Sequence, residues 1–354
     1  MRALRIAFAV ACLFIASLAR AESVFPGASW EHAEPVAAGW SAGGLKEAEA
    51  IAKDNGSTAV MIVQDGRSIA EWGGVGRRIL IHSMRKSILS ALYGIGISDG
   101  KIKLDTTLKQ LDLDDYPPRL SDAEKEATIR DLLMARSGIY HEAAAEPLGM
   151  KNRRPARGSH PHGTFWYYNN WDFNALGTIY KQLTGEAVFD AVEHRLAQPL
   201  GMQDFRARDG DNQLVRASEH PAYMMNMTAR DLARFGLLYL NKGNWAGKQI
   251  VPAAWIAEST RPLSDAPGGI SYGYLWWVSK GKFQLTVDVG NGAYSARGTG
   301  GQYLFVIPAY RLVVVHMYDM GRSSHEVTGK QVGALLQAII AAAPHLANQP
   351  PASH

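Results

Sequence analysis

The sequence has almost no cysteine: its 354 residues contain a single one, Cys12. Cys12 lies in an apolar run (residues 6–18) that follows two arginines and precedes the A-x-A pattern of residues 19–21. This order is typical of a secretory signal peptide. We therefore expect residues 1–21 to be removed. The mature chain then has no cysteine, which excludes disulfides, thiol catalysis and cysteine-bound metals.

The sequence also lacks a strong excess of either charge. Its formal net charge is +4, but three of the 37 basic residues lie in the expected signal peptide, which leaves 34 basic against 33 acidic residues. A near-neutral mature chain gives no support for a nucleic-acid partner. No segment after residue 21 has the unbroken apolar length of a membrane span. We expect a periplasmic or secreted protein with no nucleic-acid partner and no membrane span.

Strand patterns lie near both ends of the chain, and helical patterns lie between them. Residues 57–73 predict a hairpin with its turn at Asp65-Gly66, and residues 83–99 predict a helix. Further helices are predicted at 129–136, 173–185, 228–243 and 326–343, and strands at 274–279, 282–289, 303–308 and 311–319. Residues from about 100 to 260 are expected to be mainly helices and loops.

This arrangement predicts an α+β fold within residues 22–343. We expect one antiparallel sheet built from both chain ends and flanked by helices, formed by about 40–98 and 262–343. Residues of about 99–261 would form an inserted, mostly helical lobe, and 344–354 a flexible tail. A cleft between two lobes is the usual place for a small-molecule site.

The most informative motif opens the first strong helix. Ser83 and Lys86 are three residues apart, so they share one helix face and can hydrogen-bond. A lysine that is desolvated in a cleft can accept a serine proton and so activate the nucleophile. An isolated S-x-x-K match is nevertheless most often a surface lysine after a helix-starting serine.

Two further segments could complete such a site. Residues 166–170 read Trp-Tyr-Tyr-Asn-Asn, in which a tyrosine beside an amine could move protons, or the aromatics could simply fill the core. Residues 296–302 are glycine-rich and lead into an apolar strand. Their backbone N–H groups could help to form an oxyanion hole, although a plain glycine turn is the simpler interpretation.

In this order and spacing the motifs resemble the serine β-lactamase and penicillin-binding-protein-like hydrolases, especially class C β-lactamase-related members and related esterases. That family has S-x-x-K, Y-x-N and a K-T-G or H-x-G type motif on a strand. Both Tyr167-Tyr168-Asn169 and Tyr168-Asn169-Asn170 fit the second motif, and the spacing to Leu176-Gly177 favours Tyr168 and Asn170. Supporting stretches are found at 128–133, 137–138, 199–202 and 230–233, so the resemblance covers roughly residues 45–320.

The resemblance implies a β-lactamase/transpeptidase-like fold and an acyl-serine mechanism without a metal or organic cofactor. Ser83 would be the nucleophile, Lys86 and Tyr168 would manage protons, and Asn170 would orient Lys86 or the substrate. The backbone N–H groups of Ser83 and Thr299 would bind the oxyanion. Substrate contacts are expected from Arg297, Gly298 and Gly300.

The strand motif departs from the family pattern, because Ala296 stands where a β-lactamase has its lysine. Arg297 could replace the missing positive charge or could point away. We therefore expect a small ester or amide as substrate, with short-acyl esters first. Amides follow, including linear ω-amino acid oligomers, and then D-Ala peptides and β-lactams. A non-catalytic protein that binds envelope components is the alternative from another class.

Three other signals have simpler interpretations. Residues 269–273 spell the G-x-S-x-G of a nucleophile elbow around Ser271, but a loop precedes them and a strand follows, so we interpret Ser271 as a decoy. His141, His160 and His162 lack a convincing ligand pattern, and a loop is favoured over a metal site. The basic run of Lys151, Arg153, Arg154 and Arg157 is expected to be solvated rather than to line the cleft.

Overall fold

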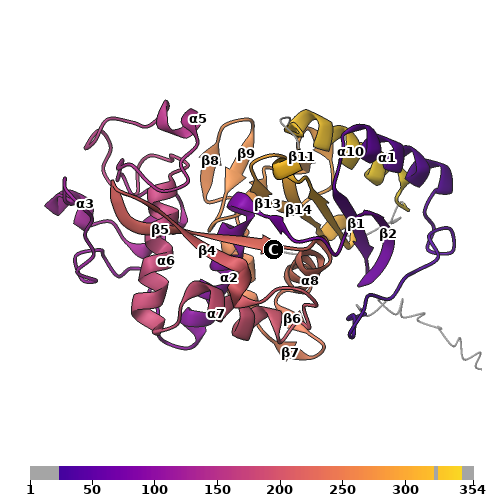
Figure 1. Ribbon diagram of the computed structural model, residues 1–354, viewed down its shortest axis with the longest axis horizontal. Coiled ribbons are helices and arrows are strands. Elements are labelled where there is room, and N and C mark those ends of the chain that lie inside the picture. The colour runs from indigo at the N-terminus through magenta and orange to yellow at the C-terminus, as the bar shows by residue number, and fades with distance from the viewer. Residues whose placement is uncertain (1–23, 323–325, 345–354) are drawn as a thin grey trace, which may run out of the picture.

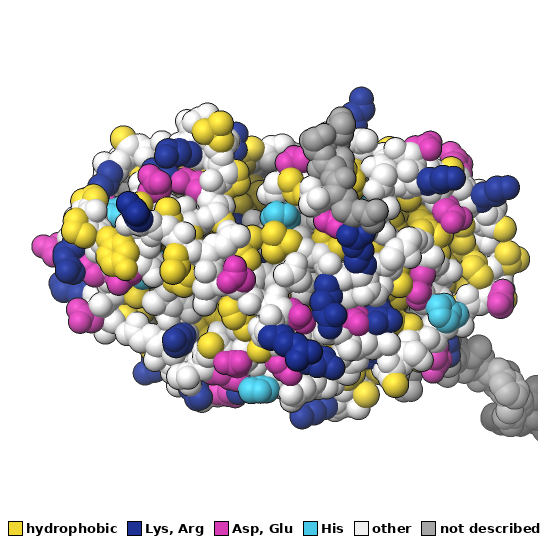
Figure 2. All heavy atoms as spheres, in the orientation of Figure 1, with side chains coloured by type: hydrophobic (Ala, Val, Ile, Leu, Met, Phe, Trp, Pro, Cys, Tyr) yellow, Lys and Arg dark blue, Asp and Glu magenta, His cyan; other side chains and the backbone are white. Residues whose placement is uncertain are grey.

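The computed structural model describes residues 24–322 and 326–344. The expected signal peptide (1–21) and residues 345–354 of the expected tail lie outside the described residues. Within the described ranges, no helix has both the length and the apolar character needed to cross a bilayer. Figure 2 shows basic and acidic side chains interspersed over the visible face, which carries no continuous basic stripe.

An antiparallel sheet of eight strands forms the centre of the fold, in the order β2-β1-β15-β14-β13-β10-β9-β8. Strand β1 pairs with β15, so the two ends of the chain meet inside this sheet (Figure 1). The expected antiparallel sheet and the α+β class are confirmed. The strands are β1 (Ala59–Gln64), β2 (Arg67–Gly73), β8 (Ser264–Ala266), β9 (Ile270–Tyr272), β10 (Trp277–Ser279), β13 (Tyr294–Gly298), β14 (Gln302–Ile307) and β15 (Leu312–Met317).

Helices cover both faces of the sheet, because alternate side chains of its central strands are buried on opposite sides. Val60 and Ile62 of β1 pack into the cluster beneath α1 (Ala42–Asp54) and α10 (Gly329–Ala342), which lie side by side (Figure 1). Met61 and Val63 pack into the larger cluster with α2 (Arg85–Ser98) and α8 (Ala229–Leu240). Strand β1 thus contributes to two apolar cores.

The middle of the chain supplies most of the other helices. The longest is α6 (Asn170–Thr184), whose N-cap is Asn169; the Asn169 side chain accepts the N–H of Trp171. It ends at Gly185, which has the left-handed conformation that favours glycine. The shorter helices are α3 (Asp122–Lys125), α4 (Ile129–Leu133), α5 (Leu148–Lys151), α7 (Val188–Val192) and α9 (Ala253–Ser259).

The segment expected to be mainly helices and loops also contains strands, namely β4 (Gly210–Val215) and the ten-residue β5 (Ser218–Met227), which join β3 (Ile79–Leu80) in a second sheet. Strand β5 is buried on both faces over much of its length, so it lacks the alternation that reveals a strand. Residues 282–289 form a small hairpin rather than one strand, with β11 (Phe283–Gln284) and β12 (Val287–Asp288). A further pair is β6 (Asn244–Trp245) with β7 (Lys248–Gln249).

Candidate active site

Ser83 lies in a short 3₁₀ turn, η1 (His82–Met84), which leads directly into α2. His82 has a φ of 48°, a conformation that a residue with a side chain rarely adopts. Lys86 is in the first turn of α2, and its Nζ is 2.9 Å from the Ser83 Oγ. The same Nζ is 2.8 Å from the Tyr168 hydroxyl and 2.8 Å from the Asn170 Oδ1. One buried amine therefore joins the serine to both residues of the second motif.

The start of α6 distinguishes the two tyrosine registers. Tyr168 and Asn170 contact Lys86, whereas the Tyr167 hydroxyl donates to the Met150 carbonyl, 2.8 Å away, in a separate apolar cluster. Asn169 caps the helix. The residues brought to Lys86 are therefore Tyr168 and Asn170, the register that the spacing favoured.

Burial shifts the pKa values of the amine and the phenol in opposite directions. It lowers the pKa of Lys86 well below its ordinary value, and the charge of Arg85 lowers it further. Burial raises the pKa of Tyr168 to about 12, against the hydrogen bond with Ser83 and the charges of Arg85 and Arg297. The rings of Tyr168 and Phe173, each 4.2 Å from Nζ, favour the ammonium. Such contacts are weaker than the cost of desolvating a buried cation. Burial therefore favours the neutral amine and the protonated phenol.

Strand β13 lies close to η1, the turn that carries Ser83. A Cβ on Gly298 would lie 2.5 Å from the Ile81 carbonyl oxygen and 3.2 Å from the His82 Cβ, so only glycine lets β13 approach η1 this closely. Thr299 follows Gly298 and lines the same cleft as Ser83. This cleft has a volume of about 250 Å³. Gly300 continues the turn between β13 and β14. The two residues expected to supply oxyanion N–H groups therefore line one space.

A buried histidine holds the turn that follows Thr299. His316 of β15 donates its Nδ1–H to the Gly301 carbonyl, 2.6 Å away, because a carbonyl can only accept. Its Nε2 then accepts the hydroxyl proton of Ser57, at 2.8 Å. Burial lowers the pKa of His316 to about 4, so the ring is neutral in the folded protein. Sequence reasoning missed this residue, since a lone histidine in an apolar strand carries no motif.

Ala296 and Arg297 lie on opposite faces of β13, because side chains alternate along a strand. Ala296 is buried on the face of Gly298, which faces η1. The Arg297 guanidinium donates to Ser295 Oγ at 3.0 Å and to Gln284 Oε1 at 2.7 Å. The Trp277 ring is 5.2 Å from the Arg297 Cζ and 5.3 Å from the Tyr168 ring. The strand thus presents no basic side chain on the face nearest Ser83, and substrate binding by Arg297 stays a prediction.

The rim of the cleft comes from the loop before α5. Asn170 Nδ2 donates to the Ala145 carbonyl at 2.5 Å, which fixes this loop above Lys86. The next residue, Glu146, lines the cleft and is paired with Arg154. Part of the basic run therefore neutralises a carboxylate at the cleft, where a solvated loop was expected. Arg157, which follows α5, is paired with Glu124 of α3.

Ser271, the other candidate nucleophile, lacks the surroundings that a nucleophile elbow requires. Ser271 is the middle residue of β9, is 1% exposed, and pairs with Val278 and Asp265 of neighbouring strands. A nucleophile elbow requires a turn between a strand and a helix. Ser271 lies within a sheet, so the interpretation as a decoy agrees with its context.

The three histidines considered as metal ligands do not converge on one point. His141 contacts Glu124, His162 contacts Asp131, and His160 stacks on Phe165 at 4.0 Å. A separate group, Asp115 with Glu219 and His220, is close enough to hold an ion. However, the Asp115 carboxylate already accepts four hydrogen bonds, from Tyr116 N, Trp171 Nε1, Ser218 Oγ and Glu219 N. This saturation favours a structural role.

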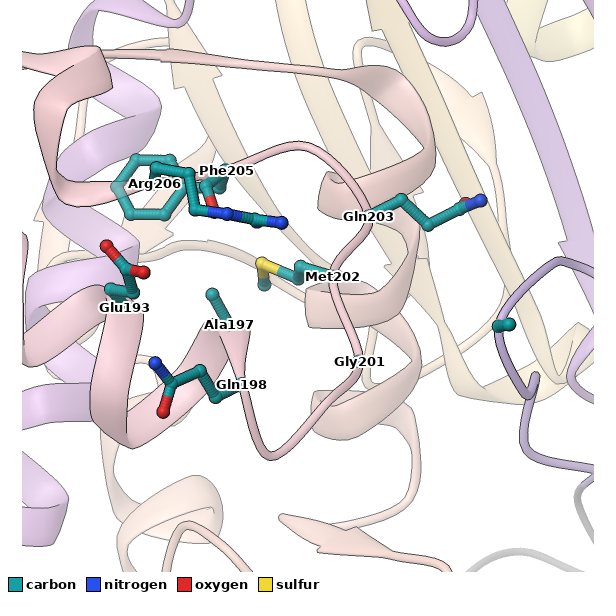
Figure 3. Close-up of a pocket in the computed structure, with 9 residues that line it drawn as sticks. Glu193, Ala197, Gln198, Gly201, Met202, Gln203, Phe205 and Arg206 are labelled. Carbon is teal, nitrogen blue, oxygen red and sulfur yellow. The ribbon is translucent and has the colours of Figure 1, made fainter.

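A larger hollow of about 580 Å³ lies away from this chemistry, beside the loop that follows α7. Figure 3 shows Glu193 at the left, the Arg206 guanidinium to its upper right, and Ala197 and Met202 below the guanidinium. Glu193 Oε2 accepts the N–H of Ala207 at 2.6 Å, and Arg206 donates to the Phe205 carbonyl at 2.6 Å. Both charged groups therefore stabilise local backbone, and no serine or lysine lines this hollow.

Comparison with known proteins finds one matching family model and several solved structures with a similar fold. The family model described as Beta-lactamase matches residues 46–332. A proposed 6-aminohexanoate-dimer hydrolase from Bacillus anthracis superposes with a TM-score of 0.63 and 21% identity, over 85% of this chain and 82% of that one. A penicillin-binding protein homologue from Caulobacter crescentus gives 0.62 and 16%, over 89% and 99%. EstCE1, a hydrolase with promiscuous acyltransferase activity, gives 0.57 and 17%, over 84% and 98%.

Proposed function

This chain belongs to the Beta-lactamase family of hydrolases, and from that premise we propose that it is an exported serine hydrolase that cleaves a small ester through an acyl-Ser83 intermediate. The observation that carries the proposal is the position of Lys86 Nζ, within 2.9 Å of Ser83 Oγ and 2.8 Å of both Tyr168 and Asn170. Export rests on the signal-peptide pattern of residues 1–21, which implies a periplasmic or secreted protein.

The proposed acylation uses the neutral form of Lys86. A neutral amine can donate its two N–H groups to Asn170 and Tyr168 while its lone pair accepts the proton of the Ser83 hydroxyl. Ser83 Oγ then bonds to the substrate carbonyl carbon, and the N–H groups of Ser83 and Thr299 stabilise the oxyanion. The tetrahedral intermediate collapses as the leaving alcohol takes the proton from Lys86, directly or through the Tyr168 hydroxyl. A water molecule, deprotonated by the same amine, releases the acid and restores Ser83.

The substrate class is inferred from what β13 lacks. Ala296 is apolar and Arg297 lies on the far face of the strand, so the cleft has no strand cation to bind a β-lactam carboxylate. The acyl-transfer residues do not depend on that cation. Short-acyl esters are therefore the first choice. Amides are the second, because one similar fold belongs to a proposed 6-aminohexanoate-dimer hydrolase, and D-Ala peptides and β-lactams follow.

The proposal is tested by steady-state hydrolysis of p-nitrophenyl acetate and butyrate, with a linear ω-amino acid dimer as the amide. We expect ester turnover by the wild type and a loss of about 10³-fold or more in Ser83→Ala, since the nucleophile has no substitute. Ser271→Ala is the control, because it removes the hydroxyl of a serine that is buried in a strand and lies outside the cleft. Binding of envelope fragments without any turnover would instead support the non-catalytic alternative.

A further inference from the structure

Arg85 is a buried cation that lines the cleft beside Ser83. It is 1% exposed, so it belongs to the buried wall of the cleft rather than to its mouth. Only Nη2 of its guanidinium has a hydrogen-bond acceptor, Asn174 Oδ1 at 3.0 Å, while Nε and Nη1 are buried without one. No Asp or Glu of residues 24–322 and 326–344 forms an ion pair with it. A guanidinium keeps its proton in proteins, so this charge is permanent.

Neutral groups hold this cation in place. The centre of the Tyr223 ring lies 4.4 Å from the Arg85 Cζ, an arrangement that attracts a cation without neutralising it. Asn174, which accepts from Arg85, donates in turn to the Ala144 carbonyl at 3.1 Å. Burying an unpaired charge is strongly unfavourable, and an apolar side chain would fill the same space with less cost. Two nitrogens of Arg85 thus keep donors for an acceptor that the described part of the chain does not supply.

The other groups that line the cleft do not offset this charge. Glu146 is the one carboxylate among them, and both Nε and Nη2 of Arg154 donate to it. Burial lowers the pKa of His82, which favours the neutral imidazole. The remaining described residues that line the cleft have uncharged side chains. The cleft therefore carries one uncompensated positive charge, at Arg85, and is suited to an anionic group.

The same cleft also offers contacts for a short apolar chain. Leu80 of β3 and Met224 of β5 line it, and both belong to the small apolar cluster around Ala144. Methylene groups gain free energy when they pack against such side chains. The exposed Gln213 of β4 adds an amide, which can donate to an anion. A volume of about 250 Å³ suits a short chain rather than a bulky acyl group.

The surroundings of Tyr168 indicate which part of the substrate enters this cleft. In the proposed reaction the leaving alcohol takes its proton from Lys86, directly or through Tyr168. The centre of the Tyr168 ring is 6.4 Å from that of Trp166 and 5.3 Å from that of Trp277. Neither tryptophan is among the described residues that line the cleft. The leaving group is therefore expected on the side of these aromatic rings, and the acyl chain on the side of Arg85.

We propose that Arg85 binds a carboxylate at the far end of the acyl chain, so that the preferred substrates are monoesters of short dicarboxylic acids. The carboxylate accepts from the guanidinium in a charge-assisted hydrogen bond, which is stronger than a neutral one. Hydrolysis transfers the acyl group to Ser83 and releases the alcohol, and water then frees the dicarboxylic acid. The inference rests on the proposed function, because it names the acid that Ser83 carries. A β-lactam has its carboxylate beside the ring nitrogen, on the leaving side, so Arg85 is not placed to bind that group.

Matched pairs of p-nitrophenyl esters test the inference. The monoesters of glutaric and adipic acid each carry one carboxylate, and the pentanoate and hexanoate esters are their neutral counterparts of the same chain length. The readout is the ratio of kcat/KM for the charged ester to kcat/KM for the neutral one. The rate in Ser83→Ala is subtracted, because a free carboxylate can assist spontaneous hydrolysis. We expect the wild type to prefer the charged ester by roughly tenfold to a hundredfold.

Two substitutions remove the charge in different ways, and both should bring this ratio close to one. Arg85→Met deletes the guanidinium but keeps a long side chain. Asn174→Asp leaves Arg85 in place and sets a carboxylate oxygen 3.0 Å from Nη2, which neutralises the charge with little change of shape. Asn174→Ala is the matched control, because it also loses the amide contact to Ala144 but leaves Arg85 uncompensated. It should keep the preference of the wild type. A general loss of activity cancels in the ratio, since both esters react with the same serine.

The outcomes separate the inference from the proposed function. A wild-type ratio near one overturns the role of Arg85 while the esterase stands, and so does a ratio that Asn174→Asp and Asn174→Ala change equally or not at all. Should Arg85→Met fail to fold, the Asn174 pair still decides, since Arg85 is intact in both variants. A wild type that hydrolyses neither ester of a pair refutes the proposed function, and the inference with it.

Discussion

The amine of Lys86 lies 2.8 Å from the phenol oxygen of Tyr168, and burial acts on the two groups in opposite senses. It lowers the pKa of the amine and raises that of the phenol to about 12. Of the two candidate bases, Lys86 is therefore the one whose neutral, proton-accepting form burial favours.

Substitution of Lys86 and substitution of Tyr168 should change the pH dependence of ester turnover in different ways. Lys86→Met should lower ester turnover by about 10²- to 10⁴-fold, because the base is lost. Tyr168→Phe should turn over more slowly but keep an acid limb like that of the wild type, since Lys86 still titrates. Initial rates between pH 5 and 9 test this. Loss of the limb in Tyr168→Phe would identify the tyrosine as the base.

Gly298→Ala should move the N–H of Thr299 away from that of Ser83 and so disrupt the expected oxyanion site. The added Cβ would lie 2.5 Å from the Ile81 carbonyl oxygen, so β13 must move away from η1. Loss of one oxyanion donor costs about 10²- to 10³-fold in kcat. Gly43→Ala, where a Cβ meets nothing within 4 Å, is the control and should be silent. Unchanged kcat in Gly298→Ala would show that Thr299 does not bind the oxyanion.

His316 should make the fold sensitive to mild acid. Its pKa is about 4 in the folded protein and near 6.5 when exposed, so the unfolded chain binds the proton first. The contribution is complete above pH 6.5 and is lost as the pH falls toward 4, by up to about 3 kcal/mol. Urea unfolding at several pH values measures it. His316→Asn retains a donor for Gly301 and should lose less stability over that window; an equal loss would contradict this assignment.

Nitrocefin should be a poor substrate. The face of β13 nearest Ser83 carries Ala296 and Gly298, so a β-lactam carboxylate meets no strand cation there. We expect kcat/KM for nitrocefin to be roughly a hundredfold below that for p-nitrophenyl acetate. Comparable values would mean that another residue binds the carboxylate, and would restore the β-lactamase alternative.

Much of the fold was predictable because its elements carry local signals. The hairpin turn at Asp65-Gly66, the Thr228 cap of α8 and the apolar period of α2 are each visible in a short window of sequence. Strand β5 was not predictable in this way. Its side chains are buried against both α6 and neighbouring strands, and such burial arises only in the folded protein.

The residues of the site likewise divide into those that a sequence motif predicts and those that it does not. Ser83, Lys86, Tyr168 and Asn170 belong to motifs, and the structure brings all four together. Two other features were not predicted: Nε and Nη1 of Arg85 are buried without a hydrogen-bond acceptor, and His316 reaches a glycine turn from a different strand. Neither property leaves a pattern in the sequence.

The most direct test of the central claim is fluorophosphonate labelling of the mature protein, with the modified residue located by peptide mass spectrometry. We expect a single adduct on Ser83, formed faster above the pKa of Lys86 than below it and absent from Lys86→Met at the same exposure. An adduct on Ser271, or labelling of Ser83 that is indifferent to Lys86, would contradict it.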